Sequence, residues 1–511
     1  MSRPLLTIEQ ATISYSGQPV LSPINLEIKK GEQWAIVGES GSGKTSLLNA
    51  IAGNLQLSKG EIIRHFANQP AINYHHLIAF VAAKHHFRNL SNTADFYYQQ
   101  RYNSSDSEDA LTVTDYLKSV PAAESGLHYW NFEQTTQLLQ LTPLLDKQLI
   151  KLSNGETKRL MIAAALLKNP RLLLLDNPLA GLDIATRAEF NTIIHQIAAS
   201  GITIVLATGP HEIPRAITHV GILKNGTLTS IGREQYQPNA EAEPNVTKTF
   251  NLDGLLSQYP APPYQDIVRM NDVHIQYGAK VVLNAVNWQI KQGERWALLG
   301  HNGAGKSTLL SLINGDNPQA YANDIILFDK KRGSGESIWD IKKKTGFISP
   351  ELYQYFPTDS TCLQAVESGY YDTIGLFRPS DKTKAQKAMQ WLKVLEIDQY
   401  ARQLIKNIPA SAQRLCLLAR AMIKNPPLLI LDEPCQGLDE HQQQNFKNLV
   451  DSICQATNIT LIYVTHYTHQ IPNSVDKVLK LEAGMVSKNV ERIIPTLSAS
   501  QRGSTSGAPS G

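Results

Sequence analysis

The stretch WAIVGESGSGKTSLLNAIAG, residues 34–53, decides the fold. Its apolar start indicates a buried strand, its end indicates a helix, and between them GESGSGKT (38–45) fits the pattern GxxxxGK[ST]. A glycine-rich turn in this position lets backbone N–H groups face phosphates at a helix N-terminus. The stretch therefore predicts a phosphate-binding loop in an α/β domain.

The chain contains this stretch and two others twice. WALLGHNGAGKSTLLSLING (296–315) repeats the loop, and later pairs follow in the same order: KNPRLLLLDNP (168–178) with KNPPLLILDEP (424–434), and ITIVLAT (202–208) with ITLIYVT (459–465). Three matches in register indicate a duplication. The predicted division is into domains 1–236 and 267–490, a proline-bearing linker 237–266, and a disordered tail 491–511 that is rich in serine and glycine towards its end.

Composition narrows the class of protein. The 511 residues suit two domains, and a net charge of +3 gives no electrostatic reason to expect a nucleic-acid partner. The sequence has no apolar run of 18 residues, so a spanning helix is not expected. Its four cysteines have no metal-ligand spacing, which favours reduced core thiols and a cytosolic location.

The two loops supply the candidate phosphate ligands. The lysines would add positive charge beside the outer phosphates, and the neighbouring backbone would form the cradle. The candidates are Gly38, Ser40, Gly41, Ser42, Gly43, Lys44, Thr45 and Ser46 in the first copy, and Gly300, Asn302, Gly303, Ala304, Gly305, Lys306, Ser307 and Thr308 in the second.

The candidate ligands for Mg²⁺ are a hydroxyl and a carboxylate in each copy. The hydroxyls belong to Thr45 and Ser307, and the carboxylates to Asp176 and Asp432, each at the end of an apolar strand. A helix-capping role is the alternative for either aspartate, but the repeated order of loop and strand favours metal binding.

The segment LSNGE, residues 152–156, resembles the LSGGQ signature of ATP-binding cassette (ABC) ATPases. This resemblance covers nearly the whole chain before the tail. It implies two P-loop nucleotide-binding domains in tandem, each with a mixed or parallel sheet core and a helical subdomain. It also implies that Ser153 and Gly155 face ATP held by the other cassette. Tyr15 and Tyr277 match the aromatic residue that stacks on adenine in this family, although packing is an equal alternative for both.

The resemblance further implies that each ATP lies between the phosphate loop of one cassette and the signature of the other, so the two cassettes pair. At the site of the first loop, Asn177 replaces the expected glutamate, Gly209 replaces the expected histidine (His211 is a weak substitute), and IPASA (408–412) replaces the signature. The other site keeps Glu433 and His466 as its catalytic candidates, together with LSNGE. This partition predicts one hydrolytic site and one that binds ATP and turns over slowly.

Two functions remain open. The first is the cytosolic ATPase of a transporter, at the inner face of the membrane, with a permease supplied by another chain. Residues 321–347 resemble a tandem member associated with molybdenum transport, which suggests a related substrate. The second is a soluble ABC protein, ribosome-associated or regulatory and repair-linked. The family's usual glutamine after the strands in 78–84 and 345–351 is not evident, which keeps this alternative open.

Overall fold

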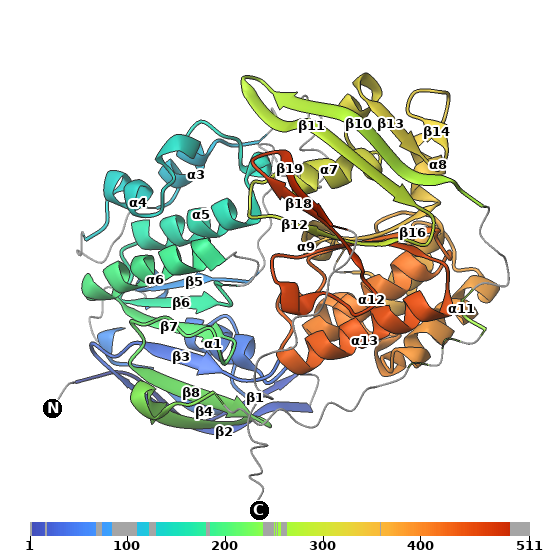
Figure 1. The fold of residues 1–511 in the computed structure, drawn as a ribbon. Coiled ribbons are helices and arrows are strands. Elements are labelled where there is room, and N and C mark those ends of the chain that lie inside the picture. Colours follow the sequence, from blue (N-terminus) through green and yellow to red (C-terminus); the bar gives the residue numbers. More distant parts are fainter. Residues whose placement is uncertain are drawn as a thin grey trace, which may run out of the picture.

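The computed structural model describes residues 3–15, 18–67, 74–83, 110–121, 129–179, 184–238, 250, 252, 254–256, 263–357 and 359–490. Two α/β halves lie beside each other, the first blue to green and the second yellow to red (Figure 1). Their antiparallel sheets lie at opposite ends of the picture, so the halves have opposite orientations (Figure 1). The tail predicted to be disordered lies outside the described residues.

Each half is built on a six-stranded sheet that is parallel except for its last pair. In the first half the order is β5 (Ile78–Val81), β6 (Leu172–Asp176), β7 (Thr203–Thr208), β3 (Trp34–Val37), β8 (His219–Lys224) and β9 (Thr227–Gly232). In the second it is β15 (Thr345–Ile348), β16 (Leu428–Asp432), β17 (Thr460–Val464), β12 (Arg295–Leu299), β18 (Lys477–Glu482) and β19 (Met485–Val490). The predicted α/β class is confirmed.

A separate antiparallel sheet accompanies each six-stranded sheet. It contains β2 (Gln18–Lys29), β1 (Pro4–Tyr15) and β4 (Lys59–Arg64) in the first half, and β11 (Lys280–Lys291), β10 (Asp266–Tyr277), β13 (Asp324–Leu327) and β14 (Lys330–Lys331) in the second. The sequences ATISY (11–15) and VHIQY (273–277) are the ends of the long strands β1 and β10.

The helices of the first half are α1 (Lys44–Ala52), α3 (Val113–Lys118), α4 (Phe132–Leu138), α5 (Asn154–Leu167) and α6 (Ile184–Ala199). Those of the second are α7 (Lys306–Ile313), α8 (Ile338–Lys342), α9 (Pro350–Tyr355), α10 (Cys362–Glu367), α11 (Lys382–Val394), α12 (Ala410–Met422) and α13 (Glu440–Ala456). No helix of these described parts is long and apolar enough to cross a membrane.

The interior strand β6, which lies between β5 and β7, shows why its sequence is a continuous apolar run. Successive side chains of a strand point to opposite faces, and both faces of this sheet are covered. Leu172 and Leu174 belong to the cluster that contains α1 and the antiparallel sheet. Leu173 and Leu175 belong to the cluster that contains α5 and α6. Burial on both sides therefore fixes the strand that ends at Asp176.

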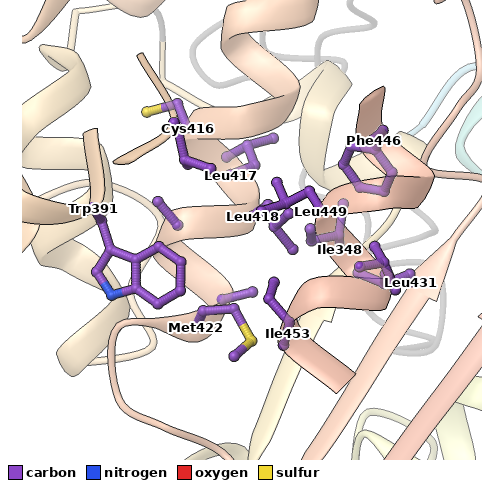
Figure 2. Packing of buried hydrophobic residues seen from close by; sticks show 14 of the residues in the cluster. Ile348, Trp391, Cys416, Leu417, Leu418, Met422, Leu431, Phe446, Leu449 and Ile453 are labelled. Carbon is purple, nitrogen blue, oxygen red and sulfur yellow. The ribbon is translucent and has the colours of Figure 1, made fainter. Parts of the chain in front are cut away.

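In the second half, α10, α11 and α12 pack on the corresponding face of the sheet. Trp391 is fully buried in this cluster with Leu417, Met422 and Leu449 (Figure 2). Leu252 and Leu255, inside the segment predicted to be a linker, are buried in the same cluster. Part of that segment is therefore packed against the second half.

The sequence KKRGSGE (330–336) forms a turn that is held together by its own side chains. Glu336 accepts hydrogen bonds from the backbone N–H groups of Gly333 (2.8 Å) and Ser334 (2.9 Å). It also pairs with Arg332 at 2.6 Å, and both of these side chains are buried. These contacts give the segment a structural role.

Candidate nucleotide-binding sites

Both phosphate loops connect a buried strand to a helix, and the position just before each helix can be occupied only by glycine. Gly43 precedes α1 with a φ of 102°, and a Cβ there would lie 2.4 Å from Leu21 Cδ2. Gly305 precedes α7 with a φ of 100°, and a Cβ there would lie 2.7 Å from Leu283 Cδ2. The left-handed backbone and the close approach both exclude a side chain. The helices begin at Lys44 and Lys306, inside the GxxxxGK[ST] pattern.

The two loop lysines hold their loops in equivalent ways. Lys44 Nζ donates to the carbonyl oxygens of Gly38 and Glu39, both at 2.7 Å. Lys306 Nζ donates to those of Gly300 (2.7 Å) and His301 (3.0 Å). Burial lowers the pKa of Lys44, and the carboxylates of Asp176 and Asp439 oppose that shift.

The first loop also contains a donor that an anion could use. Ser42 Oγ is buried and has no hydrogen-bond partner among the described residues. An unmade hydrogen bond at a buried hydroxyl is unfavourable, and a phosphate oxygen would supply the missing acceptor. The loop therefore fits a phosphate ligand.

The hydroxyl and carboxylate expected to hold a metal ion meet in the first half. Thr45 Oγ1 donates to the two carboxylate oxygens of Asp176, with distances of 3.1 Å to Oδ1 and 3.0 Å to Oδ2. Burial raises the pKa of Asp176, opposed by the Thr45 hydrogen bond and by Lys44. In the second half, Ser307 is on the first turn of α7 and Asp432 is buried at the end of β16. Hard oxygen ligands of this kind suit Mg²⁺.

In the second half, Glu433 and His466 converge on the phosphate loop. His466 Nδ1 lies 2.8 Å from the Gly300 carbonyl oxygen, and its Nε2 lies 2.7 Å from Glu433 Oε1. Both side chains are nearly buried. Glu433 Oε1 is itself buried, and His466 Nε2 is the polar group that lies beside it.

The first half preserves the backbone of this arrangement and lacks its chemistry. Asn177 has a φ of 48° and Glu433 a φ of 47°. The N–H of each donates to the neighbouring strand, to Ala207 (2.9 Å) and Val464 (3.0 Å) respectively. Replacing glutamate by asparagine thus leaves the fold intact and removes the carboxylate. At Gly209 there is no side chain.

The two signature segments differ at their first helical turn. Ser153 begins α5 with a capping box, in which its side chain and that of Glu156 each bond the other residue's backbone N–H. Gly155 follows in the first turn of that helix. Pro409 precedes α12 and provides no side-chain cap. The first-half signature therefore forms an ordered helix N-terminus, the kind of group that can bind an anion.

The aromatic candidates lie at the ends of β1 and β10. Tyr277 is 41% exposed, and its hydroxyl accepts a 2.8 Å hydrogen bond from Asn317. The partly exposed ring leaves a face on which a base could stack. Tyr15 ends β1, and its side chain lies outside the described part of the structure.

The halves touch beside the first phosphate loop. Ser40 N–H donates a 3.0 Å hydrogen bond to Asp439 Oδ2 of the second half. His211 Nε2 lies 3.3 Å from Glu440 Oε1. Asp183, the residue of the first half that corresponds to Asp439, is outside the described residues. The first loop therefore faces the segment that follows LLILDEP in the other half.

Sequence reasoning missed some charged residues beside the first site. Lys158 Nζ donates to the Asn177 carbonyl at 3.4 Å, and burial lowers the pKa of Lys158 to about 8. Glu212 lies close to Gly209, where a Cβ would be 3.5 Å from its carboxylate. Arg187 pairs with Glu212 at 2.5 Å. No sequence motif marks these residues. The nearest signal in the sequence is Gly209, which stands where the family has a histidine.

Comparison with known proteins agrees with this geometry. Residues 21–180 and 283–436 match the family model described as "ABC transporter". The chain is 33% identical over 477 residues to the Escherichia coli (strain K12) "ABC transporter ATP-binding protein ModF", covering 91% of this chain and 94% of that protein. It is 31% identical over 476 residues to an uncharacterized ABC transporter ATP-binding protein of Schizosaccharomyces pombe, covering 91% and 95% respectively. The chain therefore belongs to the ABC transporter family, as an ATP-hydrolysing member with two ATP-binding cassettes in tandem.

Proposed function

We propose that this ATPase binds two ATP molecules between its paired cassettes and hydrolyses mainly the one held by the second phosphate loop. The observation that carries this proposal is the convergence of Glu433, His466 and Gly300, which has no counterpart around Asn177 and Gly209. A carboxylate can orient water and accept its proton, whereas a neutral amide cannot.

The second site contains the groups that hydrolysis needs. The Gly300 carbonyl holds one nitrogen of His466, and the other nitrogen faces Glu433. This holds the imidazole and the Glu433 carboxylate together beside the phosphate loop, where the outer phosphate would lie. Mg²⁺, when bound, would neutralise phosphate charge; Thr45 and Asp176 would hold it in the first cassette, and Ser307 and Asp432 in the second.

The test is the fate of bound nucleotide. Purified protein is loaded with labelled ATP and Mg²⁺, passed rapidly through gel filtration, and assayed for ATP and ADP per chain. We expect two nucleotides per chain, with about one remaining as ATP after the other has been converted. Conversion of both at the same rate would contradict the asymmetric assignment.

We also propose that the ATPase energises a membrane permease supplied by another chain, with molybdate as the first substrate to examine. The support is the relative's description as an ABC transporter ATP-binding protein and the resemblance at residues 321–347. Affinity purification from membranes should recover an integral-membrane partner that changes the ATPase rate. Recovery of ribosomes or of no membrane protein would contradict this role.

A soluble, non-transport role is the second candidate. It is favoured by the residues that follow β5 and β15, Ala82 and Ser349, where transporters of this family place a glutamine that senses the membrane partner. Ser349 is buried and accepts a 3.1 Å hydrogen bond from Leu352 N–H, so it serves to cap α9. The same purification separates this candidate from the permease hypothesis.

A further inference from the structure

A residue of the first cassette contacts the turn that carries His466 in the second. Arg187 lies in α6, and its guanidinium carbon is 5.2 Å from the centre of the Tyr467 ring. Tyr467 directly follows His466 in the chain. A guanidinium within about 6 Å of an aromatic ring is attracted to its electron-rich face.

Within its own cassette, Arg187 is held in place beside Gly209, the position where the family's histidine is absent. Its Nη1 lies 2.5 Å from Glu212 Oε1, and both side chains are about three-quarters buried. Glu212 N–H donates to the Gly209 carbonyl at 3.1 Å, and Thr208 Oγ1 donates to the Glu212 carbonyl at 3.1 Å. The turn at Gly209 thus orients the carboxylate that orients Arg187.

The His466 turn is anchored at its backbone by the second cassette. Tyr467 N–H donates to Thr465 Oγ1 at 3.1 Å, and Thr465 Oγ1 donates to Gln470 Oε1 at 2.9 Å. The Tyr467 side chain faces Arg187 across the interface. Movement of this side chain would be transmitted directly to His466, whose two nitrogens contact Gly300 and Glu433.

The duplication shows that this contact belongs to one site only. Aligning the repeats places Gln443 opposite Arg187 and Pro210 opposite Tyr467. A neutral amide and a proline cannot form a cation–π pair. Gln443 Nε2 instead donates to the Leu438 carbonyl at 2.8 Å, within its own cassette. The chain therefore makes the cross-cassette contact beside Glu433 and not at its counterpart beside Asn177.

We propose that Arg187 is a positioning residue for ATP hydrolysis at the second phosphate loop, where it fixes the His466 turn through Tyr467 and is itself fixed by Glu212. This inference rests on the proposed function. The inference gives a role to the turn at Gly209 of the first cassette. Glu212 in this turn anchors Arg187, and Arg187 supports the His466 turn of the second cassette.

The test is steady-state ATP hydrolysis by the full chain. Arg187→Ala and Tyr467→Ala should each lower kcat about 3- to 10-fold, the size of a partly buried cation–π contact. The KM for ATP should change by less than about 2-fold, because neither residue belongs to a phosphate loop. Tyr467→Phe keeps the ring and should retain wild-type kcat. The double variant Arg187→Ala/Tyr467→Ala should be no slower than either single variant, because both remove one contact.

The matched control is Glu440→Gln, which alters another contact between the cassettes. Glu440 and its partner His211 are well exposed, with 82% and 51% of their side chains accessible, so kcat should not change. Additive losses in the double variant, unchanged kcat in Arg187→Ala, or a Tyr467→Phe variant as slow as Tyr467→Ala would overturn the inference. Glu433→Gln is measured alongside: if it retains wild-type turnover, the site assignment itself fails, and if it is inactive while Arg187→Ala is normal, only this inference fails.

Discussion

The backbone N–H of Ser40 donates a 3.0 Å hydrogen bond to Asp439 Oδ2, although the two residues are 399 positions apart and belong to different cassettes. The other oxygen, Oδ1, accepts a 2.8 Å hydrogen bond from Gln442 N–H and caps α13. One carboxylate therefore begins a helix in its own cassette and braces the phosphate loop of the other.

These two roles of Asp439 can be separated by substitution. Asp439→Ser keeps a capping hydroxyl but is too short to reach Ser40, whereas Asp439→Ala loses both contacts. We expect both variants to lower ATPase turnover to a similar extent, and only Asp439→Ala to lose about 1 kcal/mol of stability. Turnover and thermal melting of the same preparations check this. A wild-type rate in Asp439→Ser would mean that the loop does not depend on the bond.

Removing the carboxylate of Glu433 should stop most hydrolysis. Glu433→Gln keeps the shape and loses the proton acceptor, so turnover should fall about 10²- to 10⁴-fold. The matched change Asn177→Glu restores a carboxylate at the equivalent backbone position, with nearly the same φ. It should add little, because Gly209 and IPASA are unchanged. A rate doubled by Asn177→Glu would show that the first site is nearly competent.

Ser153 allows the composite nature of this site to be tested from the other cassette. Ser153→Asp preserves the α5 cap, since aspartate is as good a cap as serine, but places negative charge where the helix should meet phosphate. Ser153→Arg blocks the same approach with bulk. Both should abolish hydrolysis, although Ser153 and Lys306 are in different cassettes. Pro409→Arg, at the equivalent position of α12, is the comparison: α12 faces the first site, so this change should slow turnover without abolishing it.

Much of this site could be predicted from sequence because its parts are local. The Gly43 and Gly305 turns, the strand ends at Asp176 and Asp432, and the Ser153 cap are each fixed by a few adjacent residues. The Ser40–Asp439 and Arg187–Tyr467 contacts join residues hundreds of positions apart that have no periodicity in common. Leu252 and Leu255 were missed for another reason: a short apolar pair among prolines does not indicate burial until the surface that covers it is known.

Lys158 predicts a pH dependence of stability. Burial lowers its pKa to about 8 from 10.5, and the Glu212 carboxylate opposes part of that shift. Below the lower value the lysine is charged in both folded and unfolded chains, so the cost of burying the charge is fully present. Between the two values the folded chain loses the proton first, and stability therefore rises with pH.

We therefore compare the melting temperatures of wild type and Lys158→Gln at about pH 7 and about pH 9.5. The melting temperature of wild type minus that of Lys158→Gln should be about 2–4 °C greater at the higher pH. Lys168→Gln, at an exposed lysine next to the end of the same helix, should show no such shift relative to wild type. Parallel curves for wild type and Lys158→Gln would show that Lys158 keeps its ordinary pKa.

The last prediction concerns the first site, whose phosphate loop is complete. Lys44, Ser42 Oγ and the Thr45–Asp176 pair provide charge, a donor and metal ligands, so ground-state binding of Mg·ATP should persist. The missing glutamate and histidine affect the chemical step, which is separate from binding. Because Ser40 of this loop bonds Asp439 of the other cassette, nucleotide held here should keep the cassettes together.

Lys44→Ala should therefore lower nucleotide occupancy from about two to about one per chain and also slow hydrolysis at the second site. Occupancy after rapid gel filtration and ATPase rate are measured on the same sample, with EDTA to remove Mg²⁺ as a reference for lost binding. Lys306→Ala is the matched change: it should abolish hydrolysis and leave the ATP of the first site in place. Unchanged rates in Lys44→Ala, or wild-type protein with no nucleotide at the first loop, would rule out the idea that bound ATP there holds the cassettes closed.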